Sequence, residues 1–391
     1  MKKKIGILTA TRAEFGLLRP LIIRMIEDNY FKIKVLVTGA HLCPEFGNTY
    51  KEIEAAGINI DKKIECVTKG DEPFDISKNM ALAIERFGEY FKYNKLDLLI
   101  VLGDRYETLA VCIAAMNEEI PIAHIHGGES TQGAIDEAIR HSITKMSHIH
   151  FATTEKYRNR IIQLGEQPCY VFNVGALGVE NAKNINLMKK VELEENLGIK
   201  LKSKFAVVTF HPVTLEEDCG INQFEELLGA LQELKNMSFI ITKSNADAGG
   251  RKINKYIDDF AQKNNNVVAV TSLGTERYLS AINECDVVIG NSSSGIIEAP
   301  VFHTPTVNIG NRQRGRLMPK TVLSCQPYKE EIVATIKKAI SDEFQNECKY
   351  IDNPFGEGNT SENIIRILKD IFNKQGQINI DKVFYDLKTK S

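Results

Sequence analysis

Two short segments combine carboxylates, histidines and arginine in a pattern that suits proton transfer. Gly-Asp-Arg at 103–105 and His-Ile-His-Gly-Gly-Glu at 124–129 each lie at the end of an apolar run that predicts a buried strand. Carboxylates brought together shift one another's pKa, and imidazole titrates near neutrality. Asp104, His126 and Glu129 are therefore candidate acids and bases.

A third segment adds a carboxylate and an arginine on one helix. Asp136 and Arg140 are four residues apart in the helix predicted over 134–147, so they share a face. We expect Arg140 to keep Asp136 ionised, with a plain surface ion pair as the alternative. We expect no metal site at His124 and His126.

The second half of the chain carries groups suited to an anion. Gly-Asn-Ser-Ser-Ser-Gly at 290–295 is a loop of small residues between a strand and a helix, where backbone N–H groups can approach a phosphate. Ser292 and Ser293 add hydroxyl donors, and Glu298 is placed to hold ribose hydroxyls. An ordinary Ser-rich helix cap is the alternative.

Further basic groups follow other strands of this half. His211 comes at a strand end, and Arg312 belongs to Asn-Arg-Gln-Arg-Gly-Arg at 311–316. We interpret them as phosphate contacts, against a structural histidine and a solvated charge run. No G-x-G-x-x-G follows the first strand and no Walker A sequence is present, which disfavours a standard dinucleotide site or a phosphate-hydrolysing loop.

Alternating apolar runs and amphipathic segments must position these groups. Strands are predicted at 4–10, 31–40, 96–103, 120–126 and 148–154, then, after a polar linker around 175–200, at 205–212, 237–245, 266–272, 285–295 and 304–310. Such alternation predicts α/β architecture with two doubly wound parallel sheets. Ligands of such sheets bind at the carboxyl ends of the strands, so a cleft between the two domains is the expected site.

Composition excludes several classes of protein. The 391 residues carry 49 Lys and Arg against 51 Asp and Glu, without the basic excess of nucleic-acid binders. The sequence contains no run of 18 apolar residues, so no membrane span is predicted. The apolar run at 5–10 is too short for a signal peptide. Eight scattered cysteines without a C-x-x-C pair indicate free thiols, hence a cytoplasmic protein.

Taken in order, the motifs resemble the UDP-N-acetylglucosamine 2-epimerase family, especially its hydrolysing branch in bacterial sialic-acid synthesis. The matching segments are TATRAEFGLLRPL, VTGAHLCPEFGNTYKEIE, VLGDRYE, HIHGGE, DEAIRHSITKMSHIH, FHPVTLE, SNADAG, GNSSSGIIEAP and GNRQRGR. The resemblance implies GT-B architecture, with Rossmann-like domains at 1–180 and 181–365 and a C-terminal helix at about 366–391 returning to the first domain. It also implies a homodimer or homotetramer.

The family reaction fits these residues. A base removes the C2 proton while UDP leaves C1 by anti elimination, giving a 2-acetamidoglucal. Water then adds to give N-acetylmannosamine and UDP, with no redox cofactor and no metal. By resemblance, Asp104, Glu129, Asp136 and Arg140 lie in catalytic motifs, and the substrate-binding positions are Arg12, His41 (sugar), Arg105, His211, Asn245, Tyr278 (near the base), Ser292, Ser293, Glu298 and Arg312.

One departure keeps the proton-transfer roles open. Many relatives have His-Ile-Glu-Gly-Gly-Glu where this chain has His126 in place of the first Glu, a change that also occurs in some bacterial members. The base is therefore one of His126, Glu129, Asp104 and Asp136.

Three alternatives remain. Some segments also resemble epimerases of a nucleotide-linked 2,4-diacetamido-2,4,6-trideoxy sugar in legionaminic-acid synthesis. A GT-B glycosyltransferase and a non-catalytic sugar-nucleotide-binding regulator are more remote. Only an epimerase is expected to incorporate solvent deuterium at C2.

Overall fold

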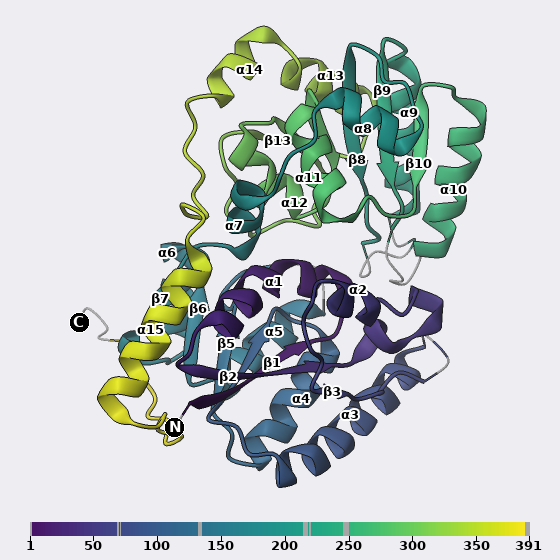
Figure 1. Ribbon diagram of the computed structural model, residues 1–391. Coiled ribbons are helices and arrows are strands. Elements are labelled where there is room, and N and C mark those ends of the chain that lie inside the picture. The colour runs from purple at the N-terminus through teal and green to yellow at the C-terminus, as the bar shows by residue number, and fades with distance from the viewer. Residues whose placement is uncertain are drawn as a thin grey trace. The chain divides into compact units, whose positions relative to one another are not determined.

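A computed structural model of the chain describes residues 2–68, 70, 72–131, 135–213, 218, 220–244 and 250–387 (Figure 1). The chain divides into two compact units. Unit 1 comprises Met1–Glu129, Ile135–Asn181 and Phe355–Ser391, and unit 2 comprises Ser130–Ala134 and Ala182–Pro354.

Among the described residues, unit 1 contains a seven-stranded parallel sheet in the order β3-β2-β1-β4-β5-β6-β7. Its strands are β1 Lys3–Thr9, β2 Phe31–Val37, β3 Lys62–Lys63, β4 Leu98–Leu102, β5 Ile122–Ile125, β6 Ile149–Ala152 and β7 Val171–Asn173. All five residues of β4 are buried, as expected for a parallel strand covered on both faces.

Helices cover both faces of this sheet (Figure 1). They are α1 Arg12–Glu27, α2 Tyr50–Ala55, α3 Pro73–Tyr93, α4 Tyr106–Asn117, α5 Asp136–Met146, α6 Glu155–Gln163 and α15 Thr360–Gln375, with short 3-10 turns η1 Gly39–Leu42, η2 Pro44–Phe46 and η3 Pro168–Tyr170. One core cluster joins α1 and α15 to the sheet, and a second joins α3, α4 and α5 to the other face.

Unit 2 has the same architecture as unit 1, a parallel sheet covered by helices. Its described residues form a six-stranded parallel sheet in the order β10-β9-β8-β11-β12-β13. The strands are β8 Lys204–Thr209, β9 Met237–Thr242, β10 Val267–Val270, β11 Val287–Gly290, β12 Thr306–Ile309 and β13 Val322–Cys325. The α/β fold class predicted from the sequence, with two doubly wound parallel sheets, is confirmed.

The helices of unit 2 also lie on both faces of its sheet. They are α8 Lys190–Leu197, α9 Ile221–Glu233, α10 Gly250–Lys263, α11 Gly274–Glu284, α12 Ser294–Ile297, α13 Lys329–Ala339, α14 Asp342–Cys348 and the 3-10 turn η4 Ala299–Phe302. One apolar cluster includes α9, α10 and α13, and another includes α8, α11 and η4.

Two predicted segments differ from the structure. The linker expected around 175–200 contains two helices, α8 and α7 (Leu177–Asn184), and the division between the units falls within α7. The C-terminal helix predicted over about 366–391 runs instead over Thr360–Gln375. It ends because Gly376 adopts a φ of 73°, which a helix cannot continue.

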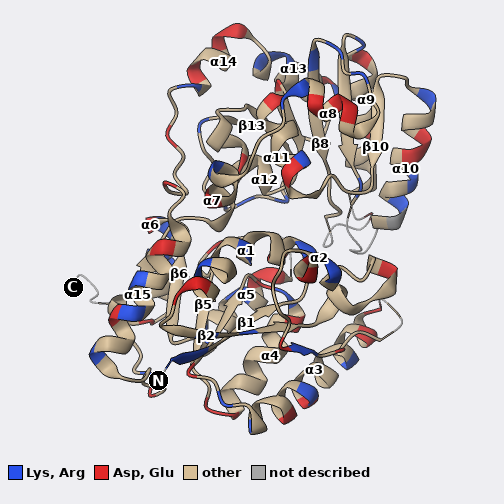
Figure 2. Cartoon of the chain, in the orientation of Figure 1, with Lys and Arg blue, Asp and Glu red and all other residues tan. Residues whose placement is uncertain are grey.

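Charges of both signs alternate along surface helices such as α10 and α15 (Figure 2), in keeping with the near balance of the composition. Within the described residues, no helix combines the length and apolar character needed to cross a membrane.

Candidate active site

The strand order of unit 1 reverses between β1 and β4, which is where ligands bind in sheets of this kind. Several predicted residues lie at the carboxyl ends of strands around this point. Arg12 begins α1 after β1, Asp104 follows β4, and His126 follows β5. The topology thus brings together residues that are far apart in sequence.

A buried arginine organises the carboxylates of unit 1. The Arg140 side chain is only 1% exposed, and its Nη2 donates to Asp104 Oδ2. Its Nη1 donates to Glu137 Oε2 at 3.0 Å and to the Glu129 carbonyl at 3.1 Å. Burial disfavours the guanidinium charge, but the carboxylates, Asp104 foremost, outweigh it and raise the pKa of Arg140. A buried cation needs such compensation.

The pKa of Asp136 does not agree with the expectation that Arg140 keeps this side chain ionised. Burial raises the pKa of Asp136, and the nearby Asp104 carboxylate raises it further. Arg105 and Arg140 oppose this shift without reversing it. Arg140 is engaged by Asp104 and Glu137, so burial prevails at Asp136 and favours its protonated form.

His126 adopts an unusual backbone conformation with a φ of 66°. A positive φ is strained for a residue with a side chain, and such strain often marks functional positions. The His126 N–H donates to the Phe151 carbonyl at 3.0 Å, and its Nδ1 lies 3.7 Å from Glu129 Oε1. Both side chains are buried, and Thr153 Oγ1 donates to the same Glu129 oxygen at 3.2 Å.

The loop between these two residues leaves no room for side chains. Gly128 has a φ of 74°, and a Cβ there would lie 2.4 Å from the Tyr157 carbonyl oxygen. The glycines of the HIHGGE motif therefore let the chain turn tightly and bring Glu129 back beside His126.

The other predicted residues of unit 1 have internal partners. His41 is fully buried, with Nε2 3.0 Å from Thr9 Oγ1 and Nδ1 2.8 Å from Thr49 Oγ1. Burial lowers the pKa of His41 to about 4, so the ring is neutral.

The two predicted arginines are held by carboxylates that sequence reasoning missed. Arg12 Nε lies 3.1 Å from Glu52 Oε1, and Arg105 Nε donates to Glu107 Oε2 at 3.1 Å. Glu107 is 1% exposed and lies only two residues after Arg105, so the spacing offered a signal for this pair.

The strand order of unit 2 reverses between β8 and β11. The predicted anion loop leaves β11 at this point, beginning at Gly290. Ser292 and Ser293 follow, and the Ser294 N–H donates to Ser292 Oγ at 3.3 Å. The helix expected after the loop is the four-residue α12, and Glu298 is its C-cap residue. Hydroxyls and backbone N–H groups, rather than a long helix dipole, are what this loop offers an anion.

Asn291 is a buried residue of this loop that sequence reasoning did not single out. Its side chain accepts from the His211 N–H at 2.7 Å and donates to the His211 carbonyl at 2.8 Å. Its own carbonyl accepts from Arg312 Nη1 at 3.1 Å and from Gln313 Nε2 at 2.7 Å. Asn291 therefore brings together two predicted phosphate contacts, and its place within the GNSSSG motif was the available signal.

His211 and Tyr278 complete the described part of this set. Burial, and then Arg312, lowers the pKa of His211 to about 3. Burial raises the pKa of Tyr278, an effect partly offset by the hydroxyls of Ser294, Thr209 and Ser292. Asn245 lies outside the described residues.

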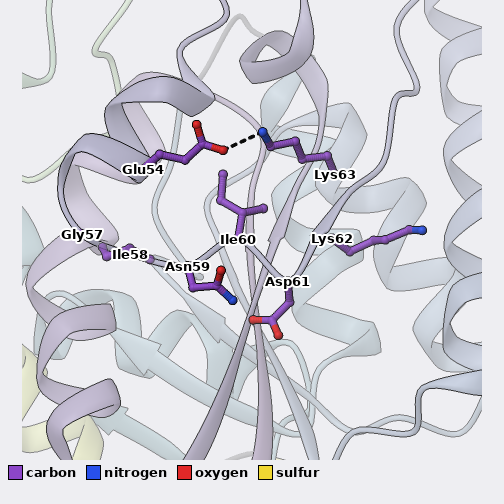
Figure 3. Close-up of a pocket in the computed structure, with 8 residues that line it drawn as sticks. All are labelled: Glu54, Gly57, Ile58, Asn59, Ile60, Asp61, Lys62 and Lys63. Atoms are coloured by element: carbon purple, nitrogen blue, oxygen red, sulfur yellow. Dashed lines mark hydrogen bonds and ion pairs between the residues drawn. The ribbon is translucent and has the colours of Figure 1, made fainter.

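A surface hollow of unit 1 lies elsewhere, at the edge strand β3 (Figure 3). It is lined by Glu54, Gly57, Ile58, Asn59, Ile60, Asp61, Lys62 and Lys63, and the Lys63 ammonium donates to Glu54 at 2.7 Å. Its lining includes none of the predicted site residues, so the hollow does not mark the chemistry described above.

Comparison with known proteins places the chain in a family. The family model described as UDP-N-acetylglucosamine 2-epimerase matches residues 24–369. The GDP/UDP-N,N'-diacetylbacillosamine 2-epimerase (hydrolyzing) of Campylobacter jejuni is 44% identical over 326 residues, covering 83% of this chain and 85% of that protein. The polysialic acid biosynthesis protein P7 of Escherichia coli is 40% identical over 98% of both chains. The chain belongs to the UDP-N-acetylglucosamine 2-epimerase family, as its motifs indicated.

The fold agrees with this membership. The crystal structure of UDP-GlcNAc 2-epimerase from Neisseria meningitidis bound to UDP-GlcNAc has a TM-score of 0.80, with 20% identity, 94% of this chain and 100% of that chain covered. At this identity the likeness establishes the fold alone, which is the GT-B class of paired Rossmann-like units. Together with the family match, it identifies an enzyme of the 2-epimerase type.

Proposed function

We propose that the chain is a hydrolysing 2-epimerase that converts UDP-N-acetylglucosamine and water into N-acetylmannosamine and UDP, for sialic-acid-type sugar synthesis. The single observation that carries the proposal is the cluster around Arg140. It joins an ion-paired carboxylate, Asp104, to a second carboxyl group, Asp136, whose pKa is raised. Within this cluster Asp136 supplies a group to donate a proton, and the neighbouring His126 and Glu129 supply the group to accept one.

The reaction has two balanced steps. In the first, a base takes the C2 proton, a C1–C2 double bond forms, and the bond between C1 and the diphosphate oxygen breaks to release UDP. In the second, water adds its oxygen to C1 and a proton returns to C2 from the other face. The sum consumes one water molecule and needs no oxidant or reductant.

The proposal assigns the proton chemistry to unit 1. Asp136 donates a proton because burial and Asp104 favour its protonated form. The His126 and Glu129 pair serves as the base. His126 Nδ1 and Glu129 Oε1 lie 3.7 Å apart. Catalytic hydrogen bonds are often this long without substrate and shorten when substrate binds. Arg140 holds the Asp104 side chain in place through their ion pair.

Unit 2 is assigned the nucleotide. Ser292 and Ser293 donate to the diphosphate, and Arg312 beside the neutral His211 stabilises the charge that develops as UDP leaves. Glu298 holds the ribose hydroxyls, and Tyr278 and Asn245 contact the nucleoside. Arg12 and Arg105 contact the substrate from unit 1. The sugar contact expected of His41 is not part of the proposal, because its ring is 0% exposed and bonded to Thr9 and Thr49.

One experiment tests the reaction and the substrate together. The protein is incubated with UDP-N-acetylglucosamine in deuterated water, and the products are followed by proton NMR. We expect free N-acetylmannosamine deuterated at C2 and one equivalent of UDP. Release of UDP without C2 deuterium would contradict the elimination, and unchanged substrate would contradict the substrate assignment.

A second substrate is favoured by a specific comparison. A relative 44% identical to this chain is named for N,N'-diacetylbacillosamine, which carries acetamido groups at C2 and C4 and lacks the C6 hydroxyl. The same incubation with UDP-linked 2,4-diacetamido-2,4,6-trideoxyglucose distinguishes the two. The better substrate is the one with the higher kcat/KM.

A further inference from the structure

We propose that His124 is a positioning residue for this reaction. Its buried ring contacts the three segments that carry Asp104, His126 and Arg140, and it fixes their positions relative to one another. The inference rests on the proposed function, because it concerns the groups assigned to proton transfer. Three contacts of the ring carry it.

The first contact fixes the residue before Asp104. His124 Nε2 lies 2.8 Å from the Gly103 carbonyl oxygen. A carbonyl only accepts, so Nε2 must carry the proton and donate it. Gly103 has a φ of 76° where β4 ends, and this bond holds the turn that directs Asp104.

The second contact reaches α5 one turn beyond Arg140. His124 Nδ1 lies 3.2 Å from Thr144 Oγ1, and that hydroxyl is also 3.0 Å from the Arg140 carbonyl. Burial lowers the pKa of His124 to about 3, so the ring is neutral and Nδ1 accepts. The single hydroxyl proton of Thr144 donates to the Arg140 carbonyl and is shared with His124 Nδ1, which favours the tautomer that the Gly103 bond requires.

The third contact lies beneath the loop that follows His126. A Cβ on Gly127 would come within 3.0 Å of His124 Nδ1 and 3.1 Å of Thr144 Oγ1. The loop therefore packs closely over the ring, immediately after the strained φ of His126. His124 is 0% exposed, so it cannot touch a substrate and acts only through these neighbours.

Paired substitutions test the role. In His124→Gln the terminal amide nitrogen takes the place of Nε2 and keeps the donor to Gly103. In His124→Asn the shorter amide reaches only the place of Nδ1. We expect kcat to fall by about 10²-fold in His124→Asn and by less than about 10-fold in His124→Gln, since a misplacement of about 1 Å costs that much.

Other readouts separate positioning from a general structural defect. KM and the Kd for UDP should stay within about 3-fold of wild type in both variants, because the contacts of His124 lie in the segments assigned to proton transfer. The pH profile of kcat in His124→Gln should keep the limbs of the wild type, since His124 does not titrate in that range. A changed limb would overturn the proposal.

A second pair guards against poor folding of the asparagine variant. Thr144→Ser keeps the hydroxyl that donates to Nδ1, whereas Thr144→Val removes it, and we expect only the valine variant to lose kcat, by about 10-fold. Equal losses in both members of each pair would overturn the positioning role while leaving the proposed function intact. A wild-type protein that turns over neither sugar nucleotide would overturn both.

Discussion

At the scale of single residues, the sequence identified the chemical groups better than their partners. Asp104, His126 and Glu129 were predictable because each stands where an apolar run ends. The partner of Arg140 was not, because Asp104 lies 36 residues away and meets it only through the fold. The left-handed backbone conformation of His126 could not be predicted from the sequence either, because a histidine gives no local sign of a positive φ.

Replacing Asp136 tests the assigned proton donor. We expect Asp136→Asn to lower kcat by about 10² to 10⁴-fold, because an amide cannot return the proton to C2. The Kd for UDP should be unchanged. Asp370→Asn makes the same substitution at an exposed position on α15 and serves as the matched control. Steady-state kinetics and C2 deuterium incorporation measure the effect. If Asp136→Asn keeps wild-type kcat, the donor must be another member of the cluster.

Glu14 makes the stability of unit 1 depend on pH. Its Oε2 accepts from the N–H groups of Ala10 at 2.7 Å and Thr11 at 3.0 Å, yet burial raises its pKa from 4.5 to about 7. Between these values the folded protein keeps a proton that the unfolded chain has released. Stability due to Glu14 therefore falls as pH rises through this window, by up to about 3 kcal/mol.

The Glu14→Gln variant lacks this titration. Relative to wild type, we expect its stability to rise between about pH 5 and about pH 8, whatever constant offset the amide introduces. Urea midpoints followed by circular dichroism measure the difference. Glu27→Gln, an exposed position at the end of the same helix, is the control. A difference between Glu14→Gln and wild type that does not change with pH would contradict the argument.

At the scale of elements, long amphipathic or apolar segments were predictable and short ones were not. β3 has two residues and β7 has three, too few to show a periodicity. α8 contains three acidic residues among its eight and buries only Leu193 deeply, so its pattern resembled a linker. The strands that precede the candidate site residues are central in their sheets. Because they are buried throughout, their sequences are continuous apolar runs, and these runs predicted the strands.

The turn out of β11 depends on a glycine. Gly290 has a φ of 134°, and a Cβ there would lie 2.0 Å from the Thr209 carbonyl oxygen on β8. We expect Gly290→Ala to push the serine loop away from β8 and to weaken UDP binding by at least about 10-fold, since the strain costs about 1–3 kcal/mol. Calorimetric titration with UDP measures the loss.

Gly229→Ala offers a matched control in the same unit. Gly229 lies within α9, where a Cβ would meet only the flexible Lys329 side chain at 3.4 Å. Alanine is preferred to glycine inside a helix, so this variant should be as stable as wild type or slightly more stable. If Gly290→Ala binds UDP as tightly as Gly229→Ala, the loop does not carry the nucleotide.

At the scale of the whole molecule, two copies of one sheet design carry different chemistry. In each unit several candidate residues follow strands at or next to the point where the strand order reverses. Carboxylates around a buried arginine gather in unit 1, whereas hydroxyls, an asparagine and an arginine gather in unit 2. This division was predictable, because fold class and strand ends together determine where side chains of each kind meet.

The same division predicts that the units differ in sensitivity to acid. Histidines with a lowered pKa are His41, His124, His148 and His150 in unit 1, and His211 in unit 2. Below the ordinary value of 6.5 the unfolded chain binds protons that these buried rings do not. Stability is therefore lost as pH falls, by at most about 1.4 kcal/mol per pH unit for each group.

We accordingly expect acidification from about pH 6.5 to about pH 5 to destabilise unit 1 more than unit 2. Glu14 and Asp136, whose pKa values are raised, oppose the loss in unit 1, but they are two groups against four. Hydrogen-exchange protection factors of β4 and β5, compared with those of β8 and β11, measure the difference. His148→Asn keeps an acceptor for the Ile122 N–H, bonded at 3.2 Å, and should reduce the pH dependence of unit 1 alone. Parallel losses in both units, unaffected by this variant, would show that these rings are already protonated in the folded protein.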